Sequence, residues 1–133
     1  MTRAGTAFSY ALVLVLTVEL AVWEAFLVGA RVFGQPLPVS ALLAGVANIG
    51  LGVAGARVLR RRVGAVLPGV IWLGIALTLG TKRAEGDLVV TGSFRGLAFL
   101  LVGTVAAAAV VGVTGARARS QAVRATPEVP VGR

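Results

Sequence analysis

The sequence contains no cysteine and no histidine among its 133 residues. The missing thiols exclude disulfides, thiolate nucleophiles and thiolate metal sites, and the missing imidazoles exclude histidine general bases. No P-loop, Rossmann or zinc motif is present either. We therefore expect no enzyme activity, no cofactor and no metal site, and we name no catalytic residue.

Charged residues are also scarce, at 14% of the chain, whereas hydrophobic residues make up 57%. Soluble domains contain roughly 25% charged residues, so this composition cannot cover an ordinary water-facing surface. The apolar residues form four long runs, at residues 6–30, 39–56, 63–80 and 97–115. Each run is near the ~20 residues that a helix needs to cross the hydrocarbon core.

We predict an all-α fold, an integral membrane four-helix bundle with its transmembrane domain in residues 1–115. A signal peptide is the alternative for the first run, but signal cores are about 7–15 residues long. This run is longer and contains Glu19 and Glu24. The basic tail at residues 116–133 has little to bury, and we predict that it is disordered.

Basic residues predict the orientation. Nine of them lie on the side that holds both termini and the loop between the second and third spans, against four on the other side. The side richer in Lys and Arg faces the cytoplasm. We therefore expect a multi-pass protein of the cell membrane with both termini in the cytoplasm.

The net charge of +8 does not indicate a nucleic-acid partner. Nucleic-acid binders gather Lys and Arg on a folded polar face, whereas here Arg lies in short gaps between apolar runs. The lipid bilayer, with its anionic headgroups, is the partner that this charge predicts.

Small residues predict how the helices pack, because helices in lipid associate through close backbone approach and polar contacts. Two stripes recur at helical spacing, Ala41, Gly45, Asn48, Gly52 and Ala56 on the second span and Thr104, Ala108, Gly112 and Ala116 on the fourth. A seam within one chain is the first interpretation, and a homodimer face is the alternative.

Glu19 and Asn48 form the candidate intramembrane polar site. Glu19 lies near the middle of the first span, where an unpaired charge is expensive. We expect it to be protonated, to line a wet cavity or to hydrogen-bond to Asn48, Thr78 or Thr104. A carboxylate that binds protons or cations is the functional alternative to a structural one.

Glu24 and the two tryptophans are assigned to simpler roles. Glu24 lies about 140° around the helix from Glu19, so the two carboxylates do not share a face. We expect Glu24 to reach the outer interface, toward Arg31. Trp23 fits an interfacial belt, whereas Trp72 is deeper in its span and fits that role less well.

The loop before the last span holds a candidate external contact, Arg83, Glu85 and Asp87. A turn around Gly86, which permits positive φ, is the first interpretation. A contact for an external partner or ion is the alternative, although two carboxylates are too few for a calcium cage.

The same loop carries a resemblance. The segment Lys82–Asp87, with Phe99-Leu100-Leu101-Val102-Gly103 in the following span, resembles an uncharacterised group of small four-span membrane proteins of actinobacteria. Those proteins carry Arg-Pro-Glu-Gly-Asp before a last span with a Phe-Leu-Leu-x-Gly core, and Ala84 stands here in place of the proline. The resemblance implies lineage and topology, and no activity.

A weaker resemblance is to the small multidrug transporters, which have four short helices and a membrane-embedded Glu in the first. Glu19 matches that residue. The second Glu at position 24, the long basic tail and the few aromatics deep in the spans depart from that pattern. Aromatics would supply the cation–π contacts to drug cations.

Two functions remain open from the sequence. The first is association, as an accessory or scaffold of another envelope component, either with other membrane proteins or as a homodimer. The alternative is a proton-coupled transporter of small molecules or cations that works as a homodimer through Glu19.

Overall fold

The computed structural model describes residues 2–30, 38–80 and 93–125. It confirms the all-α fold: these residues form α1 (Arg3–Phe26), the short 3-10 helix η1 (Leu27–Gly29), α2 (Val39–Leu59), α3 (Arg62–Gly80) and α4 (Phe94–Ala125). All four α-helices are long and apolar enough to cross a membrane.

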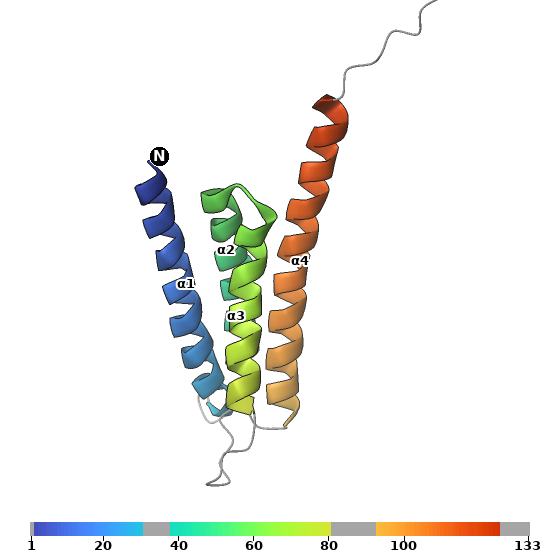
Figure 1. Ribbon diagram of the computed structural model, residues 1–133. Helices are drawn as coiled ribbons and strands as arrows, with labels where there is room; N and C mark the ends of the chain where they lie inside the picture. The colour runs from blue at the N-terminus through green and yellow to red at the C-terminus, as the bar shows by residue number, and fades with distance from the viewer. Residues whose placement is uncertain (1, 31–37, 81–92, 126–133) are drawn as a thin grey trace, which may run out of the picture.

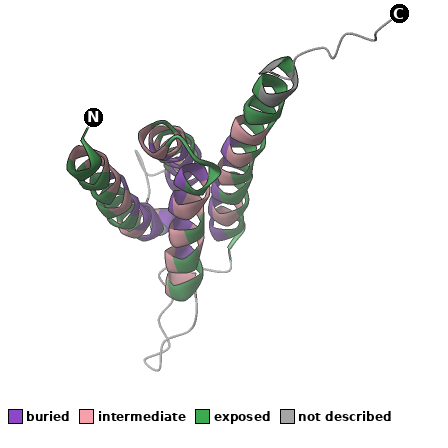
Figure 2. Cartoon of the chain, turned by 45° about the horizontal axis from the view of Figure 1, so that its top comes forward, coloured by how far each residue is buried: buried purple, intermediate pink, exposed green. Residues whose placement is uncertain are grey.

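The helices run up and down in one bundle (Figure 1). α2 and α3 form the centre, and α1 and α4 each pack on both of them, whereas among the described residues no Cα of α1 lies within 8 Å of a Cα of α4. The start of α1, the α2–α3 turn and the end of α4 lie at the same end of the bundle (Figure 1). Buried residues gather where the helices face one another, and exposed residues cover the outside (Figure 2).

The α2–α3 hairpin is closed by two glycines. Arg60 ends α2 in the left-handed region, with a φ of 51°. Gly55 and Gly64 then face each other so closely that a Cβ on either would overlap the other's carbonyl oxygen. Pro68 lacks the N–H that would bind the Gly64 carbonyl within α3. That carbonyl is therefore left to approach the Cα of Gly55, an arrangement typical of Cα–H···O contacts between helices.

The small-residue stripe of α2 is confirmed as an internal seam. Ala41, Gly45, Asn48 and Gly52 are buried, and Ala56 at the end of the stripe is half-buried. A Cβ on Gly45 would lie 3.1 Å from Cγ1 of Val102, and one on Gly52 would lie 3.0 Å from Cγ1 of Val110. Large side chains of α4 thus occupy the shallow face that the α2 glycines leave open.

The stripe on the fourth span is wrong as an internal seam. Its four residues, Thr104, Ala108, Gly112 and Ala116, are all exposed. The inward face of α4 carries Gly96, Phe99, Gly103, Ala106 and Val110 instead.

The last helix also continues past the predicted start of the tail, to Ala125. Residues 116–125 contain no glycine or proline, and they are rich in Ala and Arg, which favour helix. The tail prediction for residues 126–133 lies outside the described residues.

Candidate functional site

A buried hydrogen bond between two side chains joins α1 to α3. Nε1 of Trp72 donates a hydrogen bond to Oε2 of Glu24 at 2.8 Å. Each of the two side chains is only 1% exposed. A buried carboxylate in an apolar interior is costly without a hydrogen-bond donor, and the indole supplies one.

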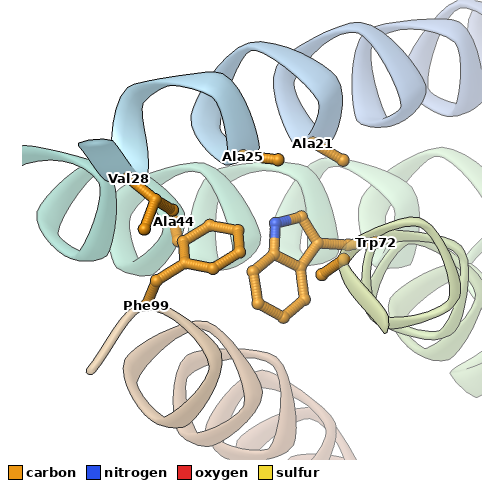
Figure 3. Packing of buried hydrophobic residues seen from close by; sticks show 7 residues of the cluster. Ala21, Ala25, Val28, Ala44, Trp72 and Phe99 are labelled. Carbon is orange, nitrogen blue, oxygen red and sulfur yellow. The ribbon is translucent and has the colours of Figure 1, made fainter. Parts of the chain in front are cut away.

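The fold of α3 and α4 positions that donor. The Trp72 ring packs against Phe99, with ring centroids 5.1 Å apart, and any Cβ on Gly103 would overlap the indole. The indole nitrogen lies on the side of the ring nearest Ala21 and Ala25 of α1 (Figure 3). The glycine of α4 and the alanines of α1 thus make room for a tryptophan that turns its N–H toward Glu24.

Two buried oxygen atoms remain available as acceptors. Oε1 of Glu24 and Oδ1 of Asn48 have no hydrogen-bond partner among the described residues. The Asn48 amide nitrogen donates to the carbonyl of Ala44 at 3.0 Å, one turn back in α2. Each free oxygen can accept a hydrogen bond from a water molecule or another small donor. No group of three metal-ligating side chains occurs in the described part of the chain.

The expectation that Glu24 reaches the outer interface is therefore wrong. The signal that identifies it is the spacing of small residues on the first span, where Thr17, Ala21, Ala25 and Val28 are buried with Glu24. The sequence-based prediction assigned small inward faces to the second and fourth spans only, and it did not include this face of the first span. Trp72 is 1% exposed and belongs to the core. Trp23 is 66% exposed, as a residue of the interfacial belt would be.

Glu19 lies on the opposite, outward side of α1. It is exposed and makes no hydrogen bond or ion pair within the described chain. Its expected partners are engaged or turned away. The Asn48 amide donates to the Ala44 carbonyl, the Thr78 hydroxyl donates to the Gly74 carbonyl, and Thr104 is exposed. The structure therefore separates Glu19 from Asn48 and does not form the predicted pair.

The candidate loop contact of Arg83, Glu85 and Asp87 lies outside the described residues, and it stays a prediction.

The chain matches the model of one protein family. The model of a family of unknown function, DUF6113, matches residues 1–127. The chain belongs to DUF6113. Neither the curated proteins nor the solved structures gave a match. Membership in DUF6113 agrees with the resemblance to an uncharacterised four-span group, and the roles of individual residues follow from geometry alone.

Proposed function

We propose that this protein acts by association, as an accessory or scaffold subunit of another envelope component, through the outward face of α1. The observation that supports the proposal is the exposure of Glu19. An outward carboxylate in the middle of a membrane span requires a partner that lipid tails cannot supply.

The depth of Glu19 in the span determines the free-energy cost that a partner would remove. The span Arg3–Gly29 has 27 residues, and Glu19 lies near its middle. Insertion scales assign about 2.5–3.5 kcal/mol to a charged side chain at the centre of a helix. A neighbouring helix that donates a hydrogen bond or a cation to Glu19 would remove much of this cost.

The residues around Glu19 suit a helical partner. Phe8, Leu12, Val15, Trp23 and Phe26 are all exposed, and with Glu19 they follow one another at intervals of three or four residues. That spacing forms one continuous stripe along a helix, as in coiled-coil seams. We infer that a single transmembrane helix of the partner packs along this stripe and that Glu19 sets its register.

Orientation and chemistry agree with a subunit role. The excess of basic residues supports a cell-membrane protein with both termini in the cytoplasm. With no cysteine or histidine in the chain, we propose that it is not an enzyme.

The exposure of Glu19 also keeps a second candidate open. In a homodimer built on α1, two Glu19 carboxylates would share one interface. That arrangement would suit a proton-coupled transporter, because two nearby carboxylates do not ionise together readily.

Site-specific photo-crosslinking in native membranes tests both candidates. A photoreactive residue replaces Val15 or Trp23 on the stripe, and Val70 of α3 or Leu101 of α4 serves as control. Each control matches a stripe position in exposure: Val15 is 56% exposed and Val70 is 59%, and Trp23 and Leu101 are each 66% exposed. We expect one other membrane protein to be captured from the stripe positions only.

The hydrogen-bonding ability of the Glu19 side chain provides the specificity control. Glu19→Leu should abolish the crosslink, and Glu19→Gln should keep it, because the amide retains hydrogen-bonding ability. Capture of a second copy from the stripe, with transport lost in Glu19→Gln, would favour the homodimeric transporter. Equal yields at all four positions, or no dependence on Glu19, would refute association through this face.

A further inference from the structure

A groove of about 960 Å³ opens between α2 and α4 at the end of the bundle that holds the α2–α3 turn. Its volume is at the upper end of the range for ligand pockets. The walls are apolar and the rim is basic. Its residues are Ile49, Val53, Ala56, Arg57, Arg60, Arg61, Arg62, Ala109, Val110, Val113, Thr114, Arg117, Ala118 and Gln121.

The polarity of the groove changes along its length. Ile49 and Val53 of α2 and Val110 and Val113 of α4 line the part away from the α2–α3 turn, and the arginines lie nearer the helix ends. At 1.5 Å per residue, the distance along α2 from Ile49 to Arg60 is about 16 Å. That is close to half of the ~30 Å hydrocarbon core, so the groove is about one leaflet deep.

The charge at the rim is one-sided. Five arginines line the groove, and no carboxylate of the described residues does. The Arg62 guanidinium donates to the carbonyl of Gly115 at 3.4 Å, which ties the α2–α3 turn to α4. Arg57 on α2 and Arg117 on α4 flank this contact from the two helices.

We propose that this groove binds an anionic phospholipid, with its phosphate among the rim arginines and an acyl chain along the apolar wall. Guanidinium groups bind phosphate oxygens in bidentate fashion. An apolar slot one leaflet deep beneath those groups fits a lipid better than a soluble anion, because it gives the acyl chain a surface to cover. Basic pockets between membrane helices on the cytoplasmic side bind acidic headgroups in this way.

The lipid site is independent of the association proposed for α1. Neither α1 nor Glu19 lines the groove. A failure to capture a partner through α1 would leave the lipid proposal standing, and the reverse also holds.

Native mass spectrometry of the detergent-purified full chain tests the proposal. The protein is titrated with phosphatidylglycerol or with phosphatidylcholine carrying the same acyl chains. We expect one phosphatidylglycerol to bind with clear preference over phosphatidylcholine. Glycerophosphoglycerol, which has the headgroup but no acyl chains, should not displace it. Equal binding of the two lipids, displacement by the soluble headgroup, or a second copy of the chain in place of lipid would each overturn the proposal.

Two variants with a matched control locate the site. Arg57→Gln with Arg117→Gln should weaken phosphatidylglycerol binding about 25-fold, at about five-fold for each arginine near an acidic headgroup. Arg119→Gln with Arg124→Gln removes the same charge from exposed positions of α4 outside the groove, and it should leave the preference intact. An equal loss in both double variants would show nonspecific attraction and refute the site.

The apolar wall has a test of its own. Val113→Trp should fill the groove and weaken phosphatidylglycerol binding while every arginine is kept. Leu101→Trp is the control, because Leu101 is exposed on α4 and does not line the groove. Unchanged binding in Val113→Trp would contradict an acyl chain in the groove. Circular dichroism confirms the fold of each variant.

Discussion

Trp72 and Glu24 lie 48 residues apart in the sequence and share a hydrogen bond of 2.8 Å inside the bundle. The bond joins α3 to α1, two helices that are not consecutive in the chain. Around it the core consists of small side chains with two large aromatic rings, Trp72 and Phe99. The polar pair therefore specifies how α1 is rotated against the rest of the bundle.

A double-mutant cycle tests this pair. Trp72→Phe should lower the free energy of unfolding by about 1–3 kcal/mol, because it leaves a buried carboxyl group without its donor. In a Glu24→Leu background the same change should cost less, by about 0.6–1.7 kcal/mol, the range for such bonds in membrane proteins. Unfolding in mixed micelles by added SDS, followed by far-ultraviolet circular dichroism, measures each step. Identical costs in the two backgrounds would contradict the bond, and Glu24→Gln, which keeps an acceptor, is the mild control.

The glycines of the α2–α3 hairpin lead to a second prediction. Gly55→Ala or Gly64→Ala should destabilise the protein by about 1–3 kcal/mol, because the new methyl group meets a backbone carbonyl that cannot rotate away. Gly50→Ala and Gly74→Ala are the controls, since nothing lies within 4 Å of a Cβ at either position. Those controls should be neutral or stabilising by up to about 1 kcal/mol through helix propensity. The same SDS titration measures the free energy of unfolding of each variant. Equal values for all four variants would show that α2 and α3 lie further apart at Gly55 and Gly64 than this structure places them.

The α2–α4 seam makes a third prediction. Gly45→Leu or Gly52→Leu should lower the thermal stability in detergent more than Leu43→Ala does. A leucine at position 45 would push Val102 of α4 away, and one at position 52 would push Val110 away. Leu43, in contrast, is 43% exposed on the outside of α2. Melting curves from circular dichroism give the comparison. Equal tolerance at the three positions would mean that this face of α2 is not packed.

The orientation makes a fourth prediction. A reporter fused to the C-terminus should be active in the cytoplasm, and one inserted near residue 86 should be active outside, because nine basic residues lie on the terminal side and four on the other. A phosphatase reporter, active only outside, and a fluorescent reporter, active only inside, read the two positions. The reverse pattern would invert the orientation, and the same side for both would refute four spans.

Much of the fold could be predicted from the order of the residues alone. Apolar runs of sufficient length, separated by Arg, Gly and Pro, determine four spans because the hydrocarbon core excludes unsatisfied backbone. An even number of spans puts both ends of the chain on one side. The glycines of α2 also identify its inward face, because a helix without side-chain bulk is where another helix can approach.

The inward face of α4 and the buried polar contact of α1 were decided only by the tertiary structure. In a soluble helix the contrast between polar and apolar sides shows which side is buried, but in a membrane span both sides are apolar. Polarity therefore does not separate Glu19 from Glu24. The small residues on the face of Glu24 indicate the inner one, and the hydrogen bond to Trp72 of α3 shows that it lies inside. The basic groove likewise needs both α2 and α4, whose arginines are far apart in the chain and meet only when the helices pack.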